Sequence, residues 1–357
     1  MSVAVAVIGA GVIGRAHIRI LGALPPGQGR LAAIVDPTAE AAALAARLGV
    51  PYFTATEAML DAVRPDGAVI ATPNALHVAG ARACIARGVA ALIEKPIADD
   101  LDAAVAVADE AERAGVPLLV GHFRRHNPVM QAARRLIQEG RLGRLVTISS
   151  DSMVLKPDSY FDAAWRREIG GGPVLINLVH DIDALRFLCG EIEAVQAMTG
   201  STARRFAVED SAAVLLRFRS GALATITLSD AVPSPWCWDQ TSGENPHFIS
   251  HQANAYRLCG TDASLEMPEM ALWRYAGQCG WDQPLVREVL AVPPRDPLVE
   301  QMHHFLRVIR RDEAPLVSGR DGVATLAATL AVKRSAETGE AVHPGRALPS
   351  RTHPPGA

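Results

Sequence analysis

This sequence has few large aromatic side chains and no large excess of positive or negative charge. Phe, Trp and Tyr make up 5% of the 357 residues, whereas the hydrophobic types together make up 49%. The apolar content is therefore mostly Ala, Val, Leu and Ile, a mixture typical of buried parallel strands and the helices that cover them. The net charge is −3. This composition excludes extended disorder, and it provides no basic field to attract nucleic acid or an anionic membrane.

Paired cysteines and long apolar runs are also missing. The five cysteines are Cys84, Cys189, Cys237, Cys259 and Cys279. They are odd in number and widely spaced, which argues against a disulfide framework and against a structural zinc site. We interpret them as small buried hydrophobes in a reducing compartment, and so expect a cytoplasmic protein. No run of 18 apolar residues predicts a transmembrane helix, and the apolar start lacks the basic region of a secretory signal.

The first third of the chain alternates strand-like and helix-like segments. Such alternation predicts βαβ units and a parallel, doubly wound α/β sheet. The expected strands are Val3–Ile8, Leu31–Val35, Gly67–Ala71, Ala90–Ile93 and Val116–Val120. The expected helices between them are 13–24, 39–48, 75–87 and 101–114, and Gly49 is placed to end the second.

The pattern changes near Gly121. A helix is expected over 122–138, followed by strands at 145–149, 195–199, 211–218, 223–228 and 255–259, with a hairpin signal at Ser220-Gly221. We predict a first domain at 1–121, a second α+β domain at 122–342 and a poorly ordered tail at 343–357. The last helix, near 322–337, could pack back on the first domain. The Pro-rich stretch 231–252 is expected to be either a functional loop or mobile.

The turn Gly9-Ala10-Gly11-Val12-Ile13-Gly14 follows the first strand and opens a helix. Gly9, Gly11 and Gly14 would let the backbone approach a pyrophosphate, which Val12, Ile13 and their neighbours at the helix N-terminus would then meet with N–H donors. Asp36 ends the second strand about 20 residues on, where a carboxylate accepts hydrogen bonds from ribose hydroxyls. Because this carboxylate would repel a 2′-phosphate, NAD is favoured over NADP. The alternative is a simple turn, with Asp36 capping a loop.

Four further segments resemble the glucose-fructose oxidoreductase / inositol dehydrogenase / MocA family, in order and at family spacing over about residues 3–340. Glu94-Lys95-Pro96 is similar to the family's Glu-Lys-Pro motif. Ala71-Thr72-Pro73-Asn74 with His77 resembles the segment beside the nicotinamide ribose. The others are Gly121-His122-Phe123-Arg124-Arg125, similar to the domain junction, and Gly170-Gly171-Gly172 with His180-Asp181-Ile182-Asp183, similar to the catalytic helix.

The resemblance implies a Rossmann domain followed by an open-faced, mainly antiparallel sheet, with the active site between them. It implies NAD(P) and sugar, polyol or cyclitol substrates. It also implies homodimers or homotetramers formed through the second-domain sheet. Thr72, Asn74, His77 and Glu94 would then lie with the cofactor.

Lys95 and His180 are the candidate catalytic residues. Hydride transfer from a carbinol leaves a hydroxyl proton, so the enzyme needs a base and a positive group near that hydroxyl. His180 suits the base and Lys95 the positive group, with Glu94 able to hold the lysine by an ion pair. Taken singly, each could instead be a structural residue.

The sequence departs from the family pattern before His180. Many members have aspartate four residues earlier, where this chain has Ile176, and the nearest polar residue is Asn177. An amide orients a hydroxyl but cannot act as a carboxylate base, so His180 is the expected proton acceptor and Asn177 a substrate contact. Asp181 and Asp183 are alternatives for this orienting role, although Asp183 could instead only support the helix.

Other candidate substrate contacts are two arginines and two tryptophans. Arg124 and Arg166 could bind a carboxylate bidentately, or could simply form ion pairs. Trp236 and Trp238 could stack on a sugar face, or the loop that carries them could pack at an oligomer interface. His303-His304 lacks the further ligands of a metal site, so we expect no metal.

We therefore predict an NAD-dependent dehydrogenase acting on a secondary alcohol or hemiacetal carbon of a small sugar, cyclitol, polyol or related cyclic hydroxy acid. Two alternatives stay open. One is an NAD-assisted glycosidase, and the other is a non-catalytic regulator that senses a dinucleotide or sugar.

Overall fold

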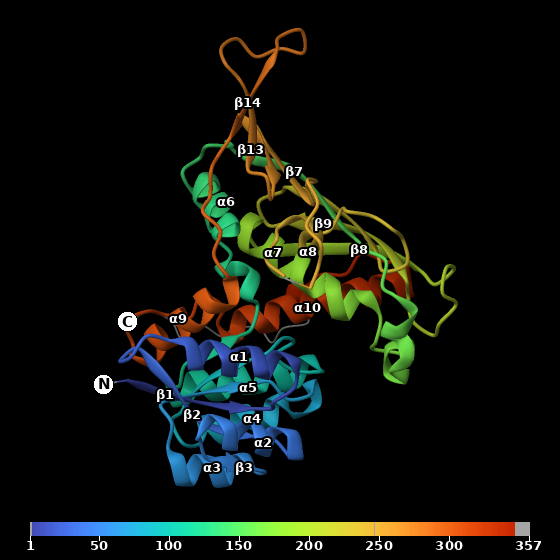
Figure 1. Cartoon of the computed structure of the whole chain (residues 1–357). Helices are drawn as coiled ribbons and strands as arrows, with labels where there is room; N and C mark the ends of the chain where they lie inside the picture. Colours follow the sequence, from blue (N-terminus) through green and yellow to red (C-terminus); the bar gives the residue numbers. More distant parts are fainter. Residues whose placement is uncertain (1, 246, 347–357) are drawn as a thin grey trace, which may run out of the picture. The chain divides into compact units, whose positions relative to one another are not determined.

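The computed structural model describes residues 2–245 and 247–346 (Figure 1). The chain divides into two compact units. The first comprises the chain up to His126 together with Asp296–Leu326, and the second comprises Asn127–Arg295 together with the chain from Ala327. A segment from within the predicted second domain is therefore part of the first unit.

The first unit is built on a six-stranded parallel sheet in the order β3-β2-β1-β4-β5-β6. This order, with two halves diverging from β1 and β4, is that of a doubly wound dinucleotide-binding sheet and confirms the predicted fold class. The strands are β1 (Val3–Ile8), β2 (Gly29–Val35), β3 (Tyr52–Phe53), β4 (Gly67–Ile70), β5 (Ala90–Ile93) and β6 (Leu118–Val120).

Five helices connect these strands: α1 (Val12–Ala23), α2 (Ala39–Leu48), α3 (Thr56–Val63), α4 (His77–Ile85) and α5 (Leu101–Ala114). Helix α2 shows how the local sequence sets their ends. The Thr38 side chain accepts a hydrogen bond from the Ala41 N–H at the start, and Gly49 ends the helix in the left-handed conformation, as predicted.

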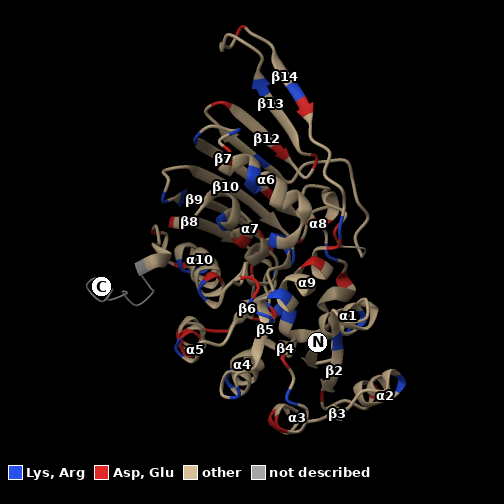
Figure 2. Cartoon of the chain, turned by 90° about the vertical axis from the view of Figure 1, so that its left-hand side faces the viewer, with Lys and Arg blue, Asp and Glu red and all other residues tan. Residues whose placement is uncertain are grey.

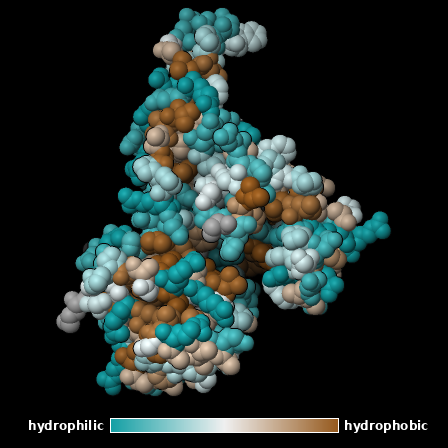
Figure 3. Space-filling model, viewed as in Figure 1, coloured by the Kyte–Doolittle hydropathy of each residue, from teal (hydrophilic) through white to brown (hydrophobic). Residues whose placement is uncertain are grey.

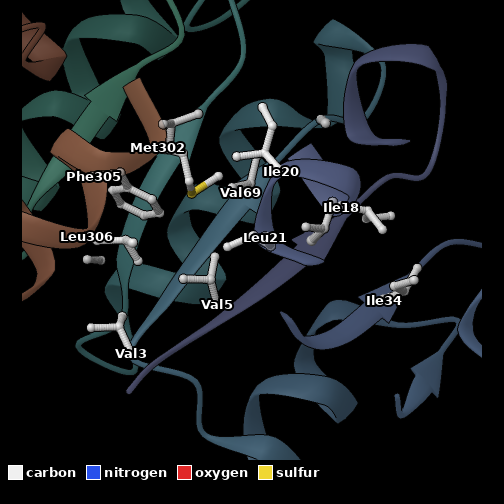
Figure 4. Close-up of a cluster of buried hydrophobic side chains, with 14 of the residues drawn as sticks. Val3, Val5, Ile18, Ile20, Leu21, Ile34, Val69, Met302, Phe305 and Leu306 are labelled. Atoms are coloured by element: carbon white, nitrogen blue, oxygen red, sulfur yellow. The ribbon is translucent and has the colours of Figure 1, made fainter. Parts of the chain in front are cut away.

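Helix α9 (Pro297–Ile309) completes the core of the first unit from the far end of the chain. Its Met302, Phe305 and Leu306 are each at most 1% exposed and belong to the cluster that contains Val5 of β1 and Leu21 of α1 (Figure 4). Full burial of such side chains contributes about 1.5–3 kcal/mol each. The first unit therefore depends on residues some 300 positions from its first strand for part of its core.

The second unit contains an eight-stranded sheet in the order β14-β13-β12-β11-β7-β10-β9-β8. Only β7 and β10 pair in parallel, so the sheet is mainly antiparallel, as predicted. Ser220-Gly221 forms the predicted hairpin between β9 and β10. The strands are β7 (Leu145–Met153), β8 (Ile192–Gly200), β9 (Ser211–Phe218), β10 (Leu223–Ser229), β11 (Tyr256–Gly260), β12 (Ala263–Met267), β13 (Ala271–Tyr275) and β14 (Leu285–Val289).

One face of this sheet is buried and the other is exposed. Buried and exposed residues alternate along β8, β9 and β10, and Met198, Leu215 and Leu223 lie on the exposed side. The helices of the second unit are α6 (Pro128–Gln138), α7 (Val179–Cys189) and α8 (Trp238–Thr241), and α10 (Gly319–Thr338) runs from the first unit into the second. All residues of β14 are exposed. In Figure 3, brown apolar patches alternate with hydrophilic surface in the region of β13 and β14.

The loop 231–252 carries the short helix α8, and Pro344–Arg346 forms a 3₁₀ turn at the start of the predicted tail. The rest of that tail, 347–357, lies outside the described residues. Acidic and basic residues are interspersed along the chain in Figure 2. None of the helices in the described ranges is both long and apolar enough to cross a membrane.

Candidate active site

Four parallel strands of the first unit end level with one another. The register pairs Ile8 with Val35 on one side and with Ile70 on the other, and Ile70 in turn pairs with Ile93. The turns that follow β1, β2, β4 and β5 therefore leave the sheet side by side at its carboxyl edge. This edge is where open α/β sheets bind ligands, and all the predicted cofactor residues are on these turns or just after them.

The glycine turn has the shape that a pyrophosphate requires. Gly9 has a φ of +94°, and a Cβ there would lie 2.5 Å from the Ala71 carbonyl oxygen. A Cβ on Gly14 would lie 1.9 Å from the Gly9 oxygen, so both glycines are required by the packing of the turn itself. A Cβ on Gly11 would meet no atom within 4 Å. Gly11 is also the N-cap of α1 and provides no side-chain cap, which leaves the helix N-terminus able to bind an anion.

Asp36 is held in place by the glycine turn and by its own loop. One carboxylate oxygen accepts a 2.7 Å hydrogen bond from the Ala10 N–H, and the other accepts bonds from the Thr38 N–H and hydroxyl at 2.9 and 2.6 Å. Burial alone would raise the pKa of Asp36, but these hydrogen bonds outweigh it and lower the pKa. The group is therefore an oriented carboxylate with lone pairs left for ribose hydroxyls. Its loop-capping role, the alternative from sequence, coexists with this arrangement.

Thr72 and Asn74 follow β4. The Thr72 hydroxyl oxygen is buried and has no hydrogen-bond partner within the described residues. A buried polar atom without a protein partner is explained when a ligand supplies one, so this observation fits a bound nicotinamide ribose. Asn74 is exposed and begins a 3₁₀ turn.

His77 has a different environment from the one predicted. Its side chain is buried, with Nδ1 2.8 Å from the Pro96 carbonyl oxygen and Nε2 2.9 Å from the Thr72 carbonyl oxygen. His77 thus ties the end of β4 to the segment after β5. This explains the burial of His77, and its contact with the cofactor stays a prediction.

Glu94 and Lys95 follow β5. The buried Glu94 carboxylate lies 2.7 Å from Nε2 of His17, a fully buried residue of α1. Sequence reasoning paired Glu94 with Lys95 and missed His17, for which the only signal is a position one turn after the glycine motif. Lys95 is half-buried at the sheet edge. Arg124 is 4% exposed in the 3₁₀ turn Phe123–His126.

In the second unit, Asn177 and His180 flank a change of helix type. Val174–Leu178 forms a π-helical turn that leads directly into α7, so Asn177 lies in the π turn and His180 in the first turn of α7. Residues three apart, such as Asn177 and His180, share a helix face only where the helix is α-helical throughout. π turns widen a helix locally and are frequent at functional sites.

Asn177 belongs to a polar network that the sequence did not predict. Its Oδ1 accepts a 2.7 Å hydrogen bond from the Lys156 ammonium, which also lies 3.1 Å from the Asp230 carboxylate. Lys156 and Asp230 are both buried. Lys156 had a signal in retrospect, because it is one of only three lysines in the chain.

Asn177, Lys156 and Asp230 line a cavity of about 210 Å³. Part of the loop 231–252 lines it as well, so the structure brings Asn177 and this loop together. The other lining residues are Ser152, Val154, Leu155, Pro157, Tyr160, Pro173, Leu228, Ser229, Cys237, Asp239 and Phe248.

Arg166 lies beside this cavity, and the two tryptophans separate. The Arg166 guanidinium stacks 3.9 Å from the centre of the Tyr160 ring and donates to the Tyr160 carbonyl at 2.6 Å. Trp236 is 47% exposed, whereas Trp238 is 1% exposed and stacks on Tyr256 at 5.3 Å. This burial favours a packing role for Trp238.

The two alternatives next to His180 are buried. Asp181 accepts hydrogen bonds from the Ser152 hydroxyl at 2.8 Å and from the Tyr256 hydroxyl. Asp183 is 1% exposed. The bonds of Asp181 connect α7 to β7 and β11, which favours a structural role for it.

Comparison with known proteins agrees with this geometry. A family described as "Oxidoreductase family, NAD-binding Rossmann fold" matches residues 3–122, and the GFO/IDH/MocA C-terminal domain matches residues 130–266. The chain is 29% identical over 345 residues to D-xylose 1-dehydrogenase (NADP(+)) 2 of Haloferax volcanii. This alignment covers 93% of this chain and 98% of that protein. It is 32% identical over 241 residues to the rhizopine catabolism protein MocA of Rhizobium meliloti, covering 66% of this chain and 74% of that protein.

A solved structure shares the whole fold. The WlbA dehydrogenase from Bordetella pertussis, in complex with NADH and UDP-GlcNAcA, superposes with a TM-score of 0.79 at 25% identity over 98% of this chain and 100% of that one. The resemblance seen in the sequence motifs is confirmed. This chain belongs to the GFO/IDH/MocA family of oxidoreductases, and its first unit is an NAD-binding Rossmann domain.

Proposed function

We propose that this chain is an NAD-dependent dehydrogenase of a small sugar, cyclitol, polyol or related cyclic hydroxy acid, acting at a secondary alcohol or hemiacetal carbon. The observation that carries the proposal is that neighbouring parallel strands of the first unit end at matched positions along the carboxyl edge of the sheet. There the glycine turn, the oriented Asp36 carboxylate, the buried Thr72 hydroxyl and Lys95 follow neighbouring strand ends. The names of relatives, such as the xylose dehydrogenase, support a sugar-like substrate.

In this proposal, the residues of the first unit bind the cofactor and polarise the substrate oxygen. The Gly9–Gly14 turn holds the pyrophosphate, Asp36 the adenosine ribose, and Thr72 with Asn74 the nicotinamide half. When bound, NAD supplies the hydride acceptor. Lys95 donates a hydrogen bond to the substrate oxygen and stabilises its developing negative charge.

The residues of the second unit handle the proton and the substrate. His180 accepts the hydroxyl proton as the carbon–hydrogen bond breaks, so one hydride and one proton leave the alcohol and a carbonyl forms. Asn177 contacts the substrate, Trp236 offers an exposed aromatic face, and Arg166 supplies a positive charge. The sequence also assigned Arg124 and Trp238 to the substrate, and both side chains are buried.

The test is NADH formation by the purified protein with a panel of sugars, cyclitols and sugar acids. We expect at least one member to be oxidised with NAD. Cleavage of aryl glycosides without NADH accumulation would instead identify an NAD-assisted glycosidase. Cofactor binding without turnover of any substrate would favour a sensing regulator.

We further propose a cytoplasmic enzyme that assembles as a homodimer or homotetramer through the second sheet. The free cysteines support the compartment. The exposed sheet face with Met198, Leu215 and Leu223 supports the assembly, because apolar side chains on one open face are stabilised when a second copy covers them. Light scattering of the purified protein measures the oligomeric state, and a monomer would refute it.

A further inference from the structure

Lys156 is a buried cation in the second unit, shortly after β7. The chain has three lysines, Lys95, Lys156 and Lys333, and Lys156 is only 8% exposed. Its ammonium lies 2.7 Å from the Asn177 Oδ1, 3.1 Å from the Asp230 carboxylate and 4.7 Å from the centre of the Tyr160 ring. A buried ammonium with these neighbours is held in one position.

Lys156 decides which way the Asn177 amide faces. An ammonium only donates hydrogen bonds, so the amide oxygen must point toward it and the amide NH₂ must point elsewhere. Within the described chain, this NH₂ donates to no other group. Asn177 lines the cavity of about 210 Å³. The side chain is thus oriented to offer a donor, whereas an aspartate could only accept.

Asp230 and Asp239 are the carboxylates that line the cavity, and the nearby cations do not share the carboxylates around it equally. The Asp230 carboxylate lies between Lys156 and Arg204, 3.1 and 3.4 Å from them, and Arg204 is also 3.7 Å from the exposed Asp158. For Arg166, by contrast, the hydrogen-bond and ring partners in the described chain are the Tyr160 carbonyl and the Tyr160 and Trp165 rings, none of them a carboxylate.

Arg166 also keeps donor capacity. Its Nε is buried and has no hydrogen-bond partner among the described residues. Burial lowers the pKa of Lys156, the Asp230 carboxylate opposes this, and the Arg204 and Arg166 guanidinium groups lower it further. An anion bound near these cations would relieve their mutual repulsion.

We infer that the substrate carries a carboxylate, whose oxygens accept hydrogen bonds from the Asn177 amide and lie in the positive field of Lys156 and Arg166. The inference rests on the proposed function and narrows its substrate class to a sugar acid or cyclic hydroxy acid. The cavity is smaller than the roughly 300–1,000 Å³ of typical ligand pockets, which suits such a small molecule.

The first test compares a sugar acid with its neutral parent, for example galacturonate with galactose, together with galactose 6-phosphate and a set of aldonates and cyclic hydroxy acids. Calorimetric binding is measured with NADH present, and turnover with NAD. We expect acids to bind more tightly than their neutral parents by about 10-fold or more. Equal or tighter binding of the neutral parents would overturn the inference. Tighter binding of the sugar phosphate than of the acids would also overturn it, because the anionic group bound would then be a phosphate.

The second test reverses the donor. Asn177→Asp keeps the shape but replaces the NH₂ with a carboxylate oxygen, so affinity for the preferred acid should fall about 10- to 100-fold while affinity for its neutral parent is retained or rises. Lys156→Met should likewise raise the KM for the acid more than it lowers kcat. Lys333→Met is the matched control and should change neither. Retained preference for the acid in Asn177→Asp would contradict the inference.

These outcomes separate the two proposals. Oxidation of neutral sugars alone would support the proposed dehydrogenase function and refute the inferred substrate carboxylate. Tight binding of acids without NADH formation from any substrate would support the carboxylate-binding site and refute the proposed dehydrogenase function.

Discussion

The two units build their sites in different ways. In the first unit, the ligand-facing groups follow the ends of parallel strands and many of them are backbone groups, such as the glycine turn and the N-terminus of α1. In the second unit, the proposed site is a network of side chains on 3₁₀, π and loop segments, with Lys156 and Asn177 at its centre. The difference shows why one cofactor can be bound with a short motif, while substrate choice is free to vary with single side chains.

The largest effect should come from the positive group at the sheet edge. Lys95→Met should lower kcat about 10²- to 10⁴-fold, because the substrate oxygen loses its hydrogen bond and its compensating charge. NAD binding, followed by protein fluorescence, should change little, since the glycine turn and Asp36 are untouched. Lys333→Met serves as the control. Full activity in Lys95→Met would remove the proposed mechanism.

The next prediction separates the two tryptophans of the second unit. Trp238→Ala should destabilise the protein by about 3–5 kcal/mol, because it leaves a cavity beside Tyr256. Trp236→Ala should leave the free energy of unfolding nearly unchanged and raise the KM for substrate. Denaturant unfolding and steady-state kinetics measure the two effects. Equal stability losses would show that both side chains only pack.

A smaller effect is expected at the adenosine ribose. Asp36→Ala removes the carboxylate that Ala10 and Thr38 orient, so NAD affinity should fall about 10-fold or more. The ratio of NADP to NAD affinity should rise, since the repulsion of a 2′-phosphate is lost. Titrations of the unsubstituted protein and of Asp36→Ala with NAD and with NADP measure this ratio. If it does not change, Asp36 is not the ribose ligand.

Two glycines should respond differently to a single methyl group. Gly14→Ala should destabilise the fold by about 1–3 kcal/mol, because its Cβ would collide with the Gly9 carbonyl. Gly11→Ala meets no protein atom, so the melting temperature should hold while NAD binding weakens. A matching loss of stability in both variants would contradict the role of Gly11 as a ligand-facing position.

The smallest effect concerns the thiols, which differ in exposure: Cys84 of the first unit and Cys189 of the second are buried, whereas Cys279 of the second is exposed. Burial raises the pKa of Cys84 and of Cys189 to about 12, whereas Cys279 is exposed. At pH 8 both buried thiols are almost entirely protonated, so an aromatic disulfide reagent should label Cys279 rapidly and these two only after unfolding. Mass spectrometry of the labelled protein locates the sites. Fast labelling of Cys84 would show that α4 opens.

Predictability from sequence also differed between the units. Strong Ala, Val and Ile runs predicted β1, β2, β4, β5 and β6, because strands buried on both faces are uniformly apolar. The short pair β3 and α3 was missed, since a two-residue strand has no readable period. In the second unit, β12, β13 and β14 were missed, and β14 is exposed at all five positions, so its apolar pattern could not be set by burial.

The sequence alone determined the family, the two fold types and the cofactor turn. These depend on local backbone requirements and on periodicity, which neighbouring residues carry. Only the tertiary structure decided what the polar side chains bind. In the structure, Glu94 contacts His17, both ring nitrogens of His77 contact carbonyl oxygens, and the Asn177 amide oxygen accepts a hydrogen bond from Lys156. Such partners lie far apart along the chain, and packing brings them within hydrogen-bond distance without leaving a pattern in the sequence.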